Sequence, residues 1–156
     1  MKSTYRVLAL LVPVIVALQA AFIAAALFGI GHWVDDGHAL SKTVLESGNG
    51  GFGGAAGIML HGVGAIVVSI VAIVLLVVAF FAHIEGGVRW ATLILADVIV
   101  QWGLAAAGTS SPAVGGLHGI NAFVMFGLGM MAATAARRSM AATKGQSSAA
   151  STGHAR

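Results

Sequence analysis

The stretches LHGVGAIVV (residues 60–68) and LHGINAFVM (residues 117–125) each place Leu-His-Gly at the start of an apolar run. The first run continues to residue 82, and Ser69 is its only polar residue after the histidine. A helix that spans the bilayer needs about 20 consecutive apolar residues. The meaning of the repeated histidine therefore depends on where it lies relative to a membrane.

The composition of the chain is that of an integral membrane protein. The 156 residues are 58% hydrophobic and only 8% charged, and the mean hydropathy is +0.96. So few charges cannot cover a soluble domain of this size, so we expect one domain with the lipid bilayer as its partner. The absence of cysteine excludes disulfides and thiolate-bound iron–sulfur clusters. The basic residues that give the net charge of +3 lie beside apolar runs. This placement indicates the orientation of membrane spans rather than nucleic-acid binding.

Four apolar runs are long enough to be considered as membrane spans. They cover residues 7–30, 58–82, 90–107 and 116–136. The third run is the least apolar because it contains Asp97 and Gln101. The first run is longer than the roughly 7–15 apolar residues of a signal-peptide core, so we expect a retained helix.

The basic residues predict an orientation for these spans. If the N-terminus is cytoplasmic, seven of the eight Lys and Arg residues lie on the cytoplasmic side and only Lys42 lies outside. The seven are Lys2, Arg6, Arg89, Arg137, Arg138, Lys144 and Arg156. This bias predicts a multi-pass protein of the bacterial inner (plasma) membrane with both termini in the cytoplasm.

The segments between and after the spans differ in character. Residues 31–57 form a long outer loop in which DDGHALSKTVLES (residues 35–47) is compatible with a short helix on the membrane surface. Residues 139–156 are Ser/Ala-rich and basic, and we expect them to form a disordered cytoplasmic tail after a transmembrane domain of residues 1–138.

Glutamine and histidine alternate along the four spans. Gln19 lies in the first, His61 in the second, Gln101 in the third and His118 in the fourth. This order predicts an all-α integral membrane fold, a four-transmembrane-helix bundle built as two parallel-repeat αα-hairpins with both termini inside.

The repeated histidines are candidate haem ligands. Because the second and fourth spans run in the same direction, His61 and His118 are expected at similar depth near the outer face. Two imidazoles facing inward at one depth suit the axial positions of a haem b. The adjacent glycines would leave room for a flat macrocycle: Gly62, Gly64 and Gly119. Asn121 is one turn after His118 and is placed to orient a neighbour or a haem edge. In the alternative interpretation, these small residues only allow close helix packing.

The chain resembles one half of bacterial haem A synthase over about residues 18–136, and also resembles small four-helix bacterial membrane proteins that look like such a half. The resemblance rests on the paired histidines and on the glutamine-containing first and third helices, and it implies that His61 and His118 are paired haem ligands. The family has glutamate where this chain has Gly57 and usually arginine where it has Gly62. A cysteine pair found in many members is absent, as is the second four-helix half. We therefore expect a haem-holding bundle without haem A synthase activity, and we assign no catalytic residue.

Five further polar residues are secondary candidates. His32 and His38 follow the first span, where they would contact haem propionates, act as alternative ligands, or be ordinary solvated histidines. Gln19, Gln101 and Asp97 would form a polar seam between the first and third spans, serving either as packing hydrogen bonds or as a proton path.

Two axial protein ligands favour electron transfer or haem handling over oxygen activation, which needs an open iron position. One alternative is a cofactor-free accessory or structural subunit that packs into a larger membrane complex or a homo-oligomer. A third function class is a small proton-linked transporter that uses Asp97.

Overall fold

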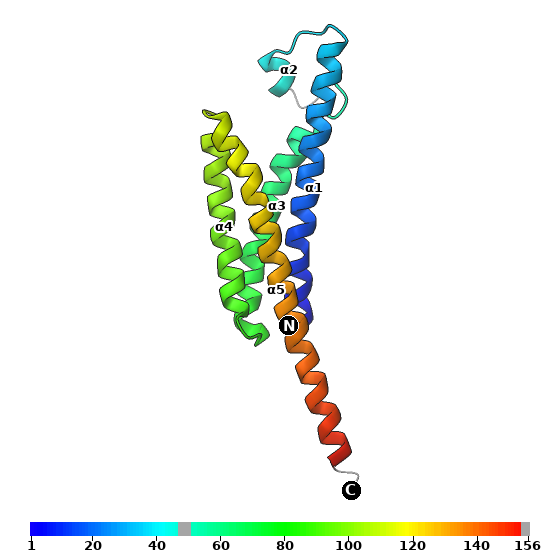
Figure 1. Ribbon diagram of the computed structural model, residues 1–156, viewed down its shortest axis with the longest axis vertical. Coiled ribbons are helices and arrows are strands. Elements are labelled where there is room, and N and C mark those ends of the chain that lie inside the picture. The colour runs from blue at the N-terminus through cyan, green and yellow to red at the C-terminus, as the bar shows by residue number, and fades with distance from the viewer. Residues whose placement is uncertain (47–50, 154–156) are drawn as a thin grey trace. The chain divides into compact units, whose positions relative to one another are not determined.

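The computed structural model describes residues 1–46 and 51–153, and within these ranges every regular element is a helix. The helices are α1 (Lys2–Asp35), α2 (Lys42–Glu46), α3 (Ala56–Ala82), α4 (Gly87–Gly108) and α5 (Pro112–Gly153) (Figure 1). Four of them, α1, α3, α4 and α5, are long and apolar enough to cross a membrane. The prediction of four such helices is therefore confirmed.

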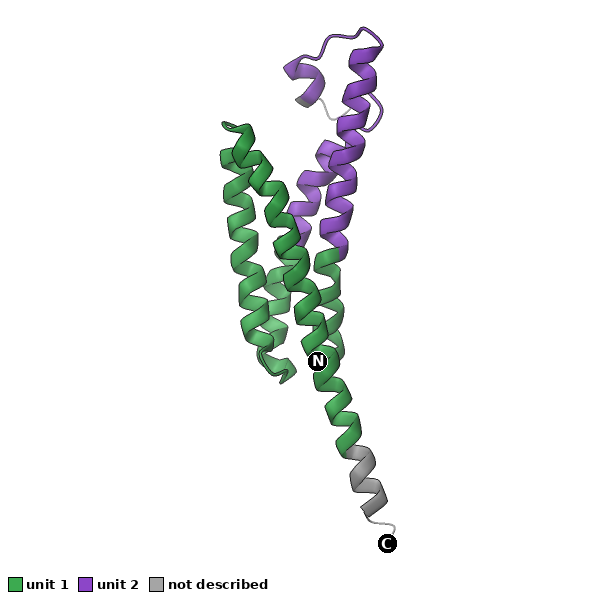
Figure 2. Ribbon diagram, in the orientation of Figure 1, with its two compact units in different colours: residues 1–13, 69–156 green, residues 14–68 purple. Residues whose placement is uncertain are grey.

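The chain divides into two compact units (Figure 2). Unit 1 comprises residues 1–13 and 69–156, and unit 2 comprises residues 14–68. Because α1 and α3 are long, each contributes one part to unit 1 and another to unit 2.

Unit 1 is built around the hairpin of α4 and α5, which pack against each other. The Tyr5 hydroxyl, on the first turn of α1, donates a 2.8 Å hydrogen bond to the Gly87 carbonyl oxygen at the start of α4. The Lys2 ammonium donates a 3.0 Å hydrogen bond to Thr143 Oγ1 of α5. The start of α1, the start of α4 and the late part of α5 therefore lie at one end of unit 1 (Figure 2).

Helices α1 and α5 approach closely within unit 1. A Cβ added at Gly129 would lie 2.7 Å from Pro13 Cδ and 3.1 Å from the Ala9 carbonyl oxygen. Any side chain at position 129 would therefore force the two helices apart. Pro13 is buried inside α1, where the proline ring and the missing N–H are expected to perturb the helix locally.

Unit 2 contains the second part of α1, the short helix α2 and the start of α3. Residues 51–55 return beside α1, and Phe52 and Ala55 are buried there. Helix α2 falls within the segment for which a short surface helix was expected. The Trp33 indole donates a 3.1 Å hydrogen bond to the Ala39 carbonyl oxygen, which fixes the chain just after α1.

Large apolar side chains lie mostly on the outside of the helices. Phe28 is 76% exposed and Phe123 is 80% exposed, whereas alanines such as Ala72 and Ala132 are fully buried. This distribution suits a bundle whose surroundings are lipid, because small residues let helix backbones approach and large apolar residues face the acyl chains.

The end of α5 differs from the sequence expectation. Residues 139–153 continue the helix, whereas a disordered tail was expected from residue 139. The extension starts from an already formed helix, so it avoids the cost of nucleation, and its alanines favour the helical state. Thr143 is held both by Lys2 and through its own hydroxyl, which donates to the Ser139 carbonyl oxygen at 3.0 Å. Residues 154–156, including His154, lie outside the described part of the chain.

Candidate functional site

In unit 2, His61 lies in the second turn of α3 and contacts Gln19 of α1. The His61 Nδ1 atom is 3.3 Å from the Gln19 backbone carbonyl oxygen. A carbonyl oxygen can only accept, so this contact is a hydrogen bond when Nδ1 carries the proton. That tautomer places the lone pair of the neutral ring on Nε2.

The Gln19 side chain lies over Gly64, one turn after His61. A Cβ added at Gly64 would come within 2.9 Å of Gln19 Cδ. Gln19 Oε1 is buried, and no hydrogen-bond donor reaches it from the described residues. The absence of a side chain at Gly64 therefore makes room for the Gln19 amide.

In unit 1, His118 lies in the second turn of α5 and makes the corresponding contact with Gln101 of α4. His118 Nδ1 is 3.2 Å from the Gln101 backbone carbonyl oxygen. The Gln101 amide Nε2 also donates a 3.0 Å hydrogen bond to the His118 backbone carbonyl oxygen. Gln101 and His118 are thus in contact at two points, which holds α4 against α5.

Asn121 and Asp97 extend this contact into a polar network. Asn121 Nδ2 donates a 2.8 Å hydrogen bond to Gln101 Oε1, and the Asn121 side chain lies beside the Asp97 carboxyl group. Asp97 is only 9% exposed, and its Oδ2 atom has no hydrogen-bond partner among the described residues. Inside an apolar helix pair, this network gives the carboxyl group a polar neighbour.

The two histidine environments share one contact and differ in one position. In each, a histidine ring nitrogen faces the backbone carbonyl of a glutamine on the preceding long helix. Three residues after the histidine, unit 2 has Gly64 and unit 1 has Asn121. Accordingly, the glutamine amide oxygen is without a donor in unit 2 and accepts from Asn121 in unit 1.

The glycines directly after the histidines are not explained by helix packing. A Cβ added at Gly62 or at Gly119 would meet no heavy atom within 4 Å. Both glycines are exposed, whereas His61 and His118 are each part-buried. At these two positions, the packing interpretation does not account for the choice of glycine.

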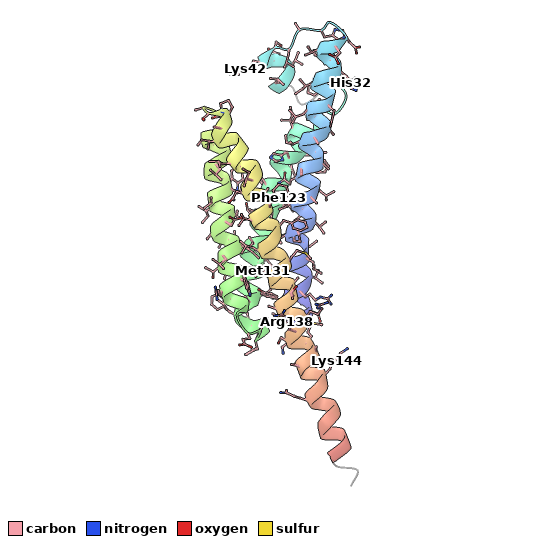
Figure 3. The ribbon with its side chains drawn as sticks, viewed as in Figure 1. His32, Lys42, Phe123, Met131, Arg138 and Lys144 are labelled. Carbon is pink, nitrogen blue, oxygen red and sulfur yellow. The ribbon has the colours of Figure 1, made fainter. Side chains whose placement is uncertain are left out.

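His32 and His38 lie in unit 2, His32 in the last turn of α1 and His38 in the following loop. Both side chains are exposed. The His38 ring lies 4.2 Å, centroid to centroid, from the Trp33 ring. His38 therefore packs against Trp33 at the surface. His32 is labelled near the end of α1 in Figure 3.

Gln19, Gln101 and Asp97 were expected to form a polar seam between the first and third spans, α1 and α4. In the structure, each of these residues instead lies against the other helix of its own hairpin. Gln101 and Asp97 reach residues of α5, and Gln19 lies against α3. The sequence interpretation missed that each glutamine presents its backbone carbonyl to a histidine. The alternation of Gln and His along the spans was the available signal.

A haem places few demands on the protein ligand set, because the porphyrin supplies four nitrogens and the chain need supply only the axial positions. In the described ranges, 1–46 and 51–153, no group of three or more metal-ligating side chains is arranged to hold a metal ion.

Compared with protein-family models, curated proteins and solved structures, the chain matches none of them. The resemblance to one half of haem A synthase therefore stays a prediction from the histidine and glutamine positions.

Proposed function

We propose that this protein is a b-type haem protein of the membrane in which His61 and His118 are the two axial ligands. The observation that carries the proposal is the repeated contact between a histidine Nδ1 and a glutamine backbone carbonyl oxygen, which is a hydrogen bond when Nδ1 carries the proton. Metal-ligating histidines characteristically donate their second ring nitrogen to a carbonyl or carboxylate, which fixes the tautomer and orients the ring.

The roles of the residues follow from this contact. Donation from Nδ1 would direct the Nε2 lone pair along a defined ring axis and make it a stronger ligand. Gln19 and Gln101 act as positioning residues through their backbone oxygens, and Asn121 secures Gln101. Gly62 and Gly119 would border the macrocycle, since no neighbouring side chain requires glycine at either position.

The function that fits two protein ligands is electron transfer or haem handling. A haem held by His61 and His118 would supply one-electron chemistry, and two protein ligands would leave no iron position for oxygen. The likeness to one half of haem A synthase is consistent with a haem-holding role and supplies no catalytic residue.

We further propose that the two hairpins are a parallel repeat and that both termini face the cytoplasm of a bacterial cell. The repeat is supported by the matching positions of Gln19 and Gln101 and of His61 and His118. The orientation is supported by the basic residues that gather at one end of unit 1, because cytoplasmic ends are enriched in Lys and Arg. They are Lys2, Arg6, Arg89, Arg137, Arg138 and Lys144.

The proposal is tested by measuring the haem content of purified variants made with ample haem supply. The wild-type protein should contain about one haem b per chain, because two axial ligands complete one iron. His61→Ala and His118→Ala should each lose haem or lose the sharp visible bands of the reduced low-spin form. His83→Ala is the matched control, because His83 is an exposed histidine just after the other end of α3.

Two outcomes would refute the haem proposal. One is a folded wild-type protein that carries no haem under these conditions, which would favour the cofactor-free accessory subunit. The other is an unchanged spectrum in both His61→Ala and His118→Ala.

A further inference from the structure

A shallow groove lies on the surface of unit 1 between α4 and α5. Its volume is about 280 Å³. It is lined by Trp90 of α4 and by Met130, Met131, Thr134, Ala135 and Arg138 of α5. Met131 and Arg138, labelled on α5 in Figure 3, lie about two helical turns apart along its length.

The walls of the groove suit a flexible hydrocarbon chain. Met130 and Met131 are 44% and 52% exposed, and methionine adapts to irregular apolar partners because its side chain is unbranched and polarisable. Trp90 is in the first turn of α4, and tryptophan prefers the level of the headgroups. The groove therefore runs from the headgroup level toward the interior of the bilayer.

Positive charge is concentrated at the headgroup end of the groove. Arg138 lines it directly. The Arg89 guanidinium lies 5.6 Å from the centroid of the Trp90 ring, so a second cation is held against the same wall. The acidic residues nearest to Trp90 along the chain, Glu85 and Asp97, do not line the groove.

We propose that this groove binds one anionic phospholipid. Arg138, with Arg89 beside it, contacts the lipid phosphate, and an acyl chain lies along Trp90, Met130 and Met131. Arginine suits this role because its planar guanidinium can donate two parallel hydrogen bonds to a phosphate. Basic recesses between membrane helices are a recognised form of lipid headgroup site. The inference is independent of haem binding.

The test uses the fluorescence of Trp90 in nanodiscs. Trp33→Phe and Trp102→Phe leave Trp90 as the single tryptophan, and the lipid is phosphatidylglycerol or phosphatidylcholine with brominated or unbrominated acyl chains. Each brominated sample is compared with its unbrominated counterpart, which removes any constant quenching by haem. Brominated phosphatidylglycerol at a low mole fraction should quench Trp90 more strongly than brominated phosphatidylcholine.

Arg138→Gln and Arg137→Gln form a matched pair, because both remove one charge from adjacent exposed positions and only Arg138 lines the groove. Arg138→Gln should lower the apparent affinity for phosphatidylglycerol about fivefold, as expected for one juxtamembrane charge. Arg137→Gln should preserve the preference.

Equal quenching by the two lipids, or an equal loss in the two arginine variants, would overturn the proposal. Loss of the preference on adding inorganic phosphate would identify a site for free phosphate and would also overturn it. Circular dichroism of each variant verifies that the helices are retained.

Discussion

His118 and His61 each contact the backbone carbonyl of a glutamine but differ in how firmly that glutamine side chain is held. Gln101 is fixed by its bond to the His118 carbonyl and by the bond it accepts from Asn121. Gln19 lies over Gly64, and its amide oxygen accepts from no described residue. The side-chain support is therefore asymmetric, although the histidine-to-carbonyl contact is repeated.

Asn121→Ala tests this asymmetry at the level of one residue. The change leaves the part-buried Gln101 Oε1 without its donor, so the free energy of unfolding should fall by about 1 kcal/mol. Thermal unfolding in detergent measures the change. The control is Thr134→Ala, because the Thr134 hydroxyl bonds only to the Met130 carbonyl of its own helix. Equal shifts in the two variants would contradict a special role for Asn121.

At the scale of the elements, the existence of the long helices could be predicted and their ends could not. The apolar run predicted a span over residues 7–30, whereas α1 covers Lys2–Asp35. The additional residues are polar or interfacial, and a hydropathy pattern does not register them, although backbone hydrogen bonding continues through them. The same reason explains why α5 extends beyond residue 138.

Gly129→Ala and Gly127→Ala should have opposite effects on the stability of α5. Alanine favours a helix over glycine by about 1 kcal/mol, and a Cβ at position 127 would meet no neighbouring atom within 4 Å. At position 129, the Cβ would collide with Pro13 of α1, and overpacking of this kind costs roughly 1–3 kcal/mol.

Thermal unfolding of the two alanine variants provides the comparison. Gly127→Ala should raise the midpoint or leave it unchanged, and Gly129→Ala should lower it. A Gly129→Ala variant as stable as Gly127→Ala would show that α1 and α5 do not approach at this point.

At the scale of the whole molecule, composition was sufficient to predict a helical membrane protein, because few charges and long apolar runs permit little else. Composition was not sufficient to predict the histidine contacts. The partner of His61 is the backbone carbonyl of Gln19, and every residue carries a carbonyl, so only the three-dimensional arrangement identifies it. The sequence likewise predicts Gly64 as a haem contact, whereas in the structure Gly64 packs against the Gln19 side chain.

The proposed orientation predicts the outcome of reporter fusions. After residue 45, a reporter that works only outside the cytoplasm should be active. At the C-terminus, a reporter that works only in the cytoplasm should be active. The reason is the Lys/Arg bias of the connecting segments. A cytoplasmic signal after residue 45 would place His61 and His118 near the inner face instead.

The central claim is that two imidazoles coordinate one haem iron. Low-temperature electron paramagnetic resonance of the oxidised, purified protein tests it most directly, because two imidazole ligands make ferric haem low-spin. We predict a low-spin signal that accounts for about one iron per haem and per chain. A predominantly high-spin signal from the loaded protein, or a folded protein that takes up no haem, would contradict the claim.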